Sequence, residues 1–122
     1  TKPSANNTVI FGSSLGGLVS YYAVLKYPEV FGKAGVFSPS FWFSDEIYTM
    51  TKNSDKIKAK IYFLYGDSES DAMMKDVRKM KYLLDDNRCY CLKLDKIVEV
   101  KGGHHNEKLW REGFGKAVLW LL

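Results

Sequence analysis

The chain has 122 residues, of which 46% are hydrophobic and 15% aromatic, and this composition excludes an intrinsically disordered protein. This length supports one domain with a sizeable core, so we expect residues 1–122 to form a single domain. The net charge of +4 comes from basic residues interleaved with acidic ones, and no apolar run approaches the roughly 20 residues of a membrane span. We therefore expect neither a nucleic acid nor a membrane as partner.

Predicted strands and helices alternate along the chain. Strands are expected where β-branched and aromatic residues end at glycine or polar turns, at 8–11, 32–37, 59–65 and 89–100. Helices are expected at 15–27, around the stripe Met73, Val77, Met80 and Leu84, and after the cap Asn106 with the stripe Trp110, Phe114, Val118 and Leu121. This order requires right-handed crossovers, which predicts an α/β fold with a mostly parallel sheet of about four strands and flanking helices.

The stretch 8–17 carries the strongest chemical signal. A strand-like run breaks into the Gly-x-Ser-x-Gly motif Gly12-Ser13-Ser14-Leu15-Gly16, and a helical pattern follows at once. Such a turn would strain Ser14 and expose its hydroxyl, while side chains at Gly12 and Gly16 would collide. Gly17 would let the helix approach the sheet, and the Leu15 N–H would face a developing oxyanion. We predict a nucleophile elbow with half an oxyanion hole, the alternative being a flexible turn.

A serine nucleophile needs a base and a carboxylate that orients the base. The two histidines, His104 and His105, are the candidate bases, and Asp67, Glu69 and Asp71 in the loop after the third predicted strand are the candidate acids. The chain order is serine, acid, histidine, each directly after a strand, and parallel strands bring such turns to one edge of the sheet. This pattern predicts a hydrolase triad, against a structural histidine beside a solvated acidic loop.

The aromatic residues Phe41 and Trp42 open a predicted connector that runs to Met50. They fit two roles equally well. They could pack beneath a loop, or they could form the apolar wall of a substrate pocket.

The two cysteines, Cys89 and Cys91, alternate in a predicted strand, and this spacing argues against a disulfide between them. Free thiols favour a reducing compartment such as the cytoplasm, and residues 1–7 lack a signal-peptide core. A metal site built from these cysteines with His104 and His105 is an alternative, but Cys-x-Cys and adjacent histidines do not match familiar zinc sites. We expect no bound metal.

Four segments of the chain also resemble a known family, namely 12–17, 27–31, 37–42 and 103–107. They are similar to the putative esterase family, which includes esterase D-like and enterochelin esterase-like α/β-hydrolases. The resemblance implies a three-layer fold and a serine esterase that cleaves small-molecule esters through an acyl-enzyme, without a cofactor. It implies Ser14 as the nucleophile, Glu69 as the acid and His105 as the base, because His104 falls at a variable position of the pattern.

The same resemblance implies further strands before the elbow, including a loop that supplies a second oxyanion N–H. Only a short polar lead precedes Thr8, so we expect this chain to correspond to the C-terminal half of such a hydrolase. The strand Thr8–Phe11 would then present an unpaired apolar edge that pairs with a missing N-terminal half or with another copy of the chain. We expect weak esterase activity, the alternative being a non-catalytic α/β assembly module.

Overall fold

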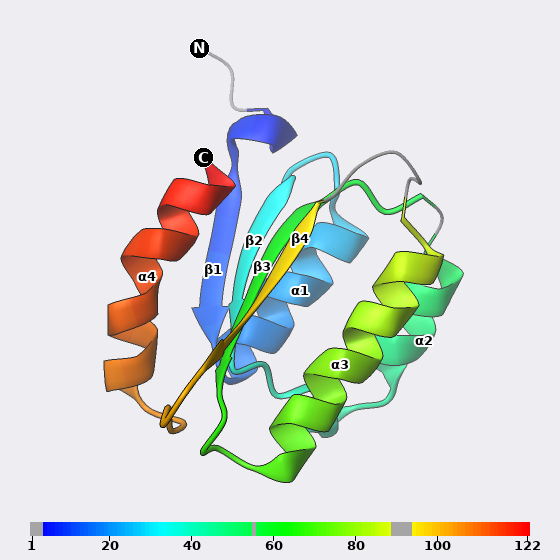
Figure 1. Ribbon diagram of the computed structural model, residues 1–122. Coiled ribbons are helices and arrows are strands. Elements are labelled where there is room, and N and C mark those ends of the chain that lie inside the picture. Colours follow the sequence, from blue (N-terminus) through cyan, green and yellow to red (C-terminus); the bar gives the residue numbers. More distant parts are fainter. Residues whose placement is uncertain (1–3, 55, 89–93) are drawn as a thin grey trace.

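A four-stranded parallel sheet forms the middle of the molecule (Figure 1). The computed structural model describes residues 4–54, 56–88 and 94–122. The strands lie side by side in chain order, as β1 (Val9–Ser13), β2 (Lys33–Phe37), β3 (Lys60–Gly66) and β4 (Asp95–Val100). Every neighbouring pair is parallel, which confirms the predicted α/β class. All strands therefore end at the same edge of the sheet.

The helices cover both faces of this sheet and give three layers (Figure 1). One face carries α1 (Leu15–Lys26), α2 (Glu46–Asn53) and α3 (Asp71–Asp86), and the other carries α4 (Glu107–Leu121). Short 3-10 turns lie at Ala5–Asn7 and Phe41–Phe43. Among the described residues, no helix is both long and apolar enough to cross a lipid bilayer.

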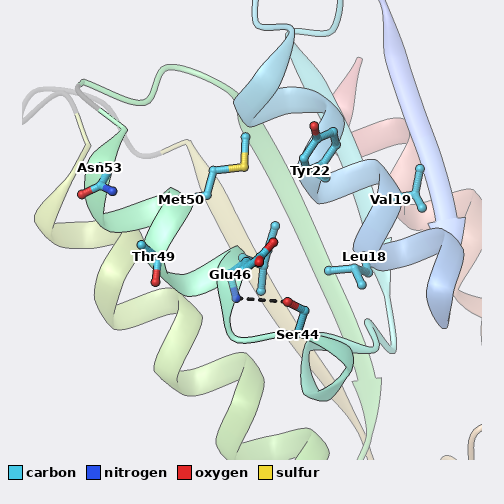
Figure 2. A pocket seen from close by; sticks show the side chains of 9 residues that line it. Leu18, Val19, Tyr22, Ser44, Glu46, Thr49, Met50 and Asn53 are labelled. Atoms are coloured by element: carbon cyan, nitrogen blue, oxygen red, sulfur yellow. Dashed lines mark hydrogen bonds between the residues drawn. The ribbon is translucent and has the colours of Figure 1, made fainter.

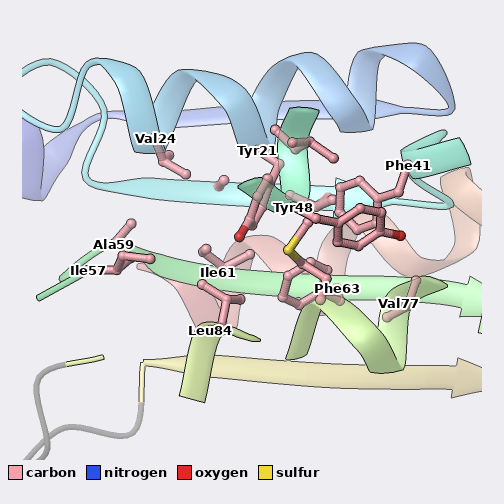
Figure 3. Close-up of a cluster of buried hydrophobic side chains, with 14 of the residues drawn as sticks. Tyr21, Val24, Phe41, Tyr48, Ile57, Ala59, Ile61, Phe63, Val77 and Leu84 are labelled. Carbon is pink, nitrogen blue, oxygen red and sulfur yellow. The ribbon is translucent and has the colours of Figure 1, made fainter. Parts of the chain in front are cut away.

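Each face of the sheet has its own hydrophobic cluster. The larger cluster fills the space under α1, α2 and α3, and it includes Tyr21, Phe41, Phe63 and Leu84 (Figure 3). The smaller cluster lies under α4, and it includes Phe37, Tyr62, Leu64, Leu109 and Leu121. The predicted stripe Met73, Val77, Met80 and Leu84 of α3 is buried as expected.

Three helical features differ from the sequence prediction. The connector expected after residue 40 contains α2, a helix that buries Ile47, Tyr48 and Thr51. In α4 the buried residues are Leu109, Ala117 and Leu121, while the expected core residue Phe114 is half exposed. Gly113 explains this rotation, because a Cβ there would lie 2.4 Å from Leu64 Cδ1 and the helix packs on that side. In α1 the apolar residues Leu15, Leu18, Val19 and Tyr22 follow the helical spacing that predicts this helix. Leu18 packs against the core, whereas Leu15, Val19 and Tyr22 are 43% to 58% exposed.

Cys89 and Cys91 lie outside the described residues, as does the first part of the strand predicted at 89–100. The described strand β4 begins at Asp95.

A nearly buried ion pair closes the sheet at the amino ends of β3 and β4. Arg88 Nε lies 3.1 Å from Asp95 Oδ1, and Lys81 Nζ lies 3.1 Å from Asp95 Oδ2. The Arg88 guanidinium also donates to the carbonyl oxygens of Ile57 and Ala59, in the segment that leads into β3. Burial lowers the pKa of Arg88, and the Asp95 carboxylate opposes that shift. The pair therefore ties the start of β4 to the segment before β3.

Removing this guanidinium should destabilise the fold strongly. In Arg88→Met, Asp95 keeps only Lys81 as a charged partner, and two backbone carbonyls lose their donor. We expect the free energy of unfolding to fall by about 3 kcal/mol, as for other broken buried pairs. Urea unfolding measures this, with the exposed Arg78→Met on α3 as the control, for which we expect a change within about 0.5 kcal/mol. Equal effects of the two substitutions would contradict the assigned role of Arg88.

The two edge strands differ in charge. Strand β4 carries the charged residues Asp95, Lys96 and Glu99, whereas β1 (Val9–Ser13) carries no charged residue. Charged side chains on an edge strand discourage pairing with another chain. Within the described part of the chain β1 pairs on one side only, with β2. We therefore propose that β1, and not β4, is the edge through which the chain associates.

Sedimentation equilibrium over a range of concentrations tests this proposal. We expect reversible self-association that Val9→Lys weakens, because a lysine on the edge opposes strand pairing. Val98→Lys on β4 is the matched control, because both valines are partly buried against the same cluster under α4. A folded protein that stays monomeric at high concentration would refute the proposal, as would equal weakening by both substitutions.

Candidate active site

Ser14 occupies a strained turn between β1 and α1. Its backbone has φ 61° and ψ −123°, a left-handed region that non-glycine residues seldom adopt. The Ser14 N–H donates to the Phe37 carbonyl oxygen at 2.9 Å, and the Ser14 carbonyl oxygen accepts from the Ser40 N–H at 3.1 Å. The end of β2 and the turn that follows it thus hold both the N–H and the carbonyl group of Ser14.

The glycines of the motif have unequal roles. A Cβ on Gly12 would lie 2.1 Å from the Gly16 carbonyl oxygen, and a Cβ on Gly17 would lie 2.8 Å from the Phe37 carbonyl oxygen. The predicted close approach is therefore confirmed for Gly12 and Gly17. For Gly16 the prediction is wrong, because a Cβ there meets nothing within 4 Å. Within the Gly-x-Ser-x-Gly motif, a side chain would therefore clash at position 12 but not at position 16.

Three side chains at the carboxyl edge of the sheet are hydrogen-bonded in series. Ser14 Oγ lies 3.0 Å from His105 Nε2, and His105 Nδ1 lies 2.6 Å from Glu69 Oε1. The Glu69 side chain is 2% exposed, whereas the His105 side chain is 41% exposed. Because a carboxylate only accepts hydrogen bonds, Nδ1 is the donor toward Glu69, and Nε2 is free to accept the proton of Ser14.

The other candidate residues lie apart from this series. Asp67 Oδ1 accepts from the Gly102 N–H at 2.7 Å, so Asp67 joins the loop after β3 to the loop after β4. Asp71 is the exposed first residue of α3, and His104 is exposed beside His105. The structure thus brings Ser14, Glu69 and His105 together and leaves Asp67, Asp71 and His104 outside.

Two glycines allow the acid loop and the histidine loop to meet. A Cβ on Gly66 would lie 2.1 Å from the Gly103 carbonyl oxygen, so the two backbones touch where a side chain would separate them. The Ser68 N–H donates to that same oxygen at 3.0 Å. This contact fixes the distance between Glu69 and His105.

Two further side chains reach the series, and sequence reasoning gave them no role there. Ser38 Oγ donates to Glu69 Oε2 at 2.7 Å and accepts from Trp110 Nε1 at 2.9 Å. The Trp110 ring stands edge-on to the His105 ring, with 5.0 Å between centroids. Ser38 lies in a segment that carries the family resemblance, which was the available signal. Ser40 also approaches, with its Oγ 3.4 Å from Ser14 Oγ.

The two aromatic pocket candidates separate in the structure. Phe41 is 0% exposed and packs against Tyr21 and Tyr48 in the larger cluster, so it is a core residue and not a pocket wall. Trp42 is 68% exposed and lies beside Phe43. Leu15, the predicted oxyanion residue, is the first residue of α1, where backbone N–H groups lack partners within the helix.

An apolar hollow of about 510 Å³ lies between α1 and α2, and residues such as Leu18, Tyr22 and Met50 line it (Figure 2). It contains none of the three hydrogen-bonded residues. A second hollow of about 290 Å³ lies beside the elbow, lined by Gly12, Ser13, Phe11, Phe37, Trp110, Arg111 and Phe114. The apolar space nearest the reactive hydroxyl is therefore the smaller one.

Within the described ranges, no cluster of three or more His, Cys, Asp or Glu side chains is placed to hold a metal ion. The alternative metal site drew on Cys89 and Cys91, which lie outside those ranges.

Replacing either outer glycine of the motif by alanine should separate their roles. Gly12→Ala forces a Cβ into the Gly16 backbone, and we expect a loss of about 2 kcal/mol in the free energy of unfolding. Gly16→Ala meets open space in a helix, so we expect a gain of up to about 1 kcal/mol. Urea unfolding of the two variants checks this. A larger loss for Gly16→Ala than for Gly12→Ala would refute the assignment of the crowding to Gly12.

Comparisons with known proteins find relatives in sequence and in structure. Uncharacterized protein YbbA from Bacillus subtilis (strain 168) is 31% identical over 126 residues, which cover 92% of this chain and 48% of that protein. The enterobactin esterase FES from Shigella flexneri, solved with 2,3-di-hydroxy-N-benzoyl-glycine, is similar with a TM-score of 0.86 at 25% identity, covering 98% of this chain and 32% of that one. S-formylglutathione hydrolase (FrmB) from Staphylococcus aureus shares the fold, with a TM-score of 0.75 at 20% identity over 98% of this chain and 53% of that one.

The chain thus spans about half the length of the curated relative and about a third of the enterobactin esterase chain. A family model described as "Putative esterase" matches residues 1–121. With a match over nearly every residue, an α/β sheet and an esterase of known structure as a neighbour, the chain belongs to this esterase family.

Proposed function

We propose that this chain carries the catalytic triad of a carboxylic ester hydrolase, with Ser14 as nucleophile, His105 as base and Glu69 as acid. The observation that supports it best is the hydrogen-bonded series from Ser14 Oγ through both ring nitrogens of His105 to Glu69 Oε1. The strained backbone of Ser14 is the second support, because such strain is typical of a nucleophile elbow.

The reaction proceeds in two steps. Ser14 Oγ attacks the ester carbonyl carbon while His105 Nε2 accepts its proton, and the carbonyl oxygen becomes an oxyanion. When the oxyanion collapses, the C–O bond to the alcohol breaks, and His105 gives its proton to that alcohol. A water molecule then attacks the acyl-enzyme while one of its protons passes to His105. The bond between the acyl carbon and Ser14 Oγ breaks, His105 returns the proton to Ser14 Oγ, and the acid is released. Glu69 holds Nδ1–H throughout and stabilises the imidazolium.

We assign the Leu15 N–H to the oxyanion, because it begins α1 directly after the nucleophile. In the longer relatives, we propose that a second donor comes from the residues that this chain does not match. Loss of one oxyanion donor costs about two to three orders of magnitude in rate. We therefore expect slow turnover by this chain alone.

We propose only the class of substrate, a small-molecule carboxylic ester. The related proteins are named for enterobactin and for S-formylglutathione, so the neighbouring folds serve both an ester and a thioester. Trp42 is proposed as a substrate contact because it is exposed and follows directly after the turn that holds Ser14.

Labelling with a fluorophosphonate tests the triad without requiring turnover. Ser14 Oγ attacks phosphorus, fluoride leaves, and the serine proton passes to His105. We expect labelling of Ser14 by peptide mapping, none in Ser14→Ala, and a loss of about two to four orders of magnitude in labelling rate for Glu69→Gln. Ser13→Ala is the matched control and should label as the wild type does.

Labelling at another serine, or an unchanged labelling rate in Glu69→Gln, would contradict the proposed triad. A folded chain that stays unlabelled would favour the alternative of a non-catalytic assembly module.

A further inference from the structure

The Glu69 carboxylate is held by more than its histidine. Oε1 faces His105 Nδ1, whereas Oε2 accepts from two donors at 2.7 Å, the Gly66 N–H and the Ser38 hydroxyl. The Gly66 donor is backbone and is fixed by β3. The Ser38 hydroxyl can rotate, so something else must direct its proton toward Glu69.

Trp110 supplies that direction. An indole nitrogen is a donor only, and a serine hydroxyl has one proton and two acceptor lone pairs. Because Trp110 Nε1–H points at Ser38 Oγ from 2.9 Å, Ser38 must accept there and use its own proton toward Glu69. The residue types therefore determine which group donates in each hydrogen bond from Trp110 through Ser38 to Glu69.

The backbone of Ser38 is also unusual. Ser38 is 0% exposed and has φ 43°, and its N–H donates to the Leu64 carbonyl oxygen at 2.7 Å. A buried non-glycine residue with positive φ persists only where its surroundings determine its conformation, and such residues cluster at functional sites.

Trp110 also contacts His105, the hydrogen-bond partner of Glu69. Its ring stands at 89° to the His105 ring, edge against face. One side chain from the first turns of α4 therefore packs against the base and, through Ser38, reaches the acid.

We infer that Ser38 and Trp110 are positioning residues that keep Glu69 Oε1 aimed at His105 Nδ1, and so keep the imidazole in the tautomer that can accept from Ser14. This inference rests on the proposed function for its effect on reactivity, although the tautomer itself can be measured without any reaction.

The first measurement is the second-order rate constant for fluorophosphonate labelling of Ser14. We expect Ser38→Ala to slow labelling by about tenfold, the effect of one hydrogen bond to a charged group. Trp110→Phe should slow labelling by a similar or smaller factor, because its N–H reaches Glu69 only through Ser38. The phenylalanine keeps an aromatic ring against His105 and removes only the N–H. The double variant should be no slower than the slower single variant, because the indole acts through the serine hydroxyl. Trp120→Phe is the matched control in α4, since Trp120 packs on Tyr62, and should label normally.

The second measurement is the tautomer of His105, read from the nitrogen-15 chemical shifts of the imidazole. We expect the Nδ1–H form in the wild type and in Trp120→Phe, and a mixture with the Nε2–H form in Ser38→Ala and Trp110→Phe. Ser38→Gly is added because glycine accepts the positive φ of this position, so it removes the hydroxyl with less risk to folding.

An unchanged labelling rate and an unchanged tautomer in folded Ser38→Gly would overturn the inference. If the effects of Ser38→Ala and Trp110→Phe multiply in the double variant, Trp110 does not act through the Ser38 hydroxyl, and that part of the inference is overturned. If wild-type Ser14 does not react with the fluorophosphonate, the proposed function fails, and the tautomer alone then decides whether Ser38 and Trp110 position His105.

Discussion

Glu69 is the point at which the ends of the strands meet. A carboxylate with a side chain 2% exposed must have its oxygens hydrogen-bonded, because burying an unpaired charge is costly. Its partners are Ser38 after β2, Gly66 at the end of β3 and His105 after β4, and His105 in turn reaches Ser14 after β1. Each of the four strands therefore contributes to one network. The parallel sheet in chain order makes this convergence possible.

The sheet continues past its strands as a ladder of backbone hydrogen bonds. The Ser14 N–H donates to Phe37, the Ser38 N–H donates to Leu64, and the Asp67 N–H donates to Val100. Each donor lies in the turn after one strand, and each acceptor is one of the last three residues of the next strand. These bonds hold Ser14 and Ser38 at positive φ, so the regular structure of the sheet stabilises two strained residues in the site.

The sequence predicted the parts of this site that depend on local pattern. The strand that ends at a Gly-x-Ser-x-Gly turn indicated Ser14, while the chain order left three acids and two histidines as candidates. The resemblance to the esterase family then chose Glu69 and His105, and the structure places these two together with Ser14. Ser38 and Trp110 are 72 residues apart, and no local pattern shows that their side chains meet. In α4 periodicity predicted the burial of Leu121 but missed Leu109 and Ala117, because the buried face is set by the absence of a side chain at Gly113 against Leu64.

The helix α2 was missed for a related reason. It has only eight residues, and the aromatic cluster before it was interpreted as part of a connector without a helix. Phe41 belongs to the core because Tyr21 and Tyr48 surround it, which is a tertiary fact. The exposed apolar residues of α1 show the converse, since helical spacing predicted the helix without telling which face is buried.

The two ends of the sheet hold buried charge in different ways. At the amino ends, Arg88 and Asp95 are both nearly buried and bonded to each other, and Arg88 also donates to the Ile57 carbonyl oxygen, an arrangement suited to stability. At the carboxyl ends, the buried Glu69 is paired with a histidine that is 41% exposed. A base must exchange its proton with groups that enter from outside, so one partner of this pair has to remain accessible. The difference in exposure between the partners, and not the presence of charge, distinguishes the candidate active site from the structural ion pair.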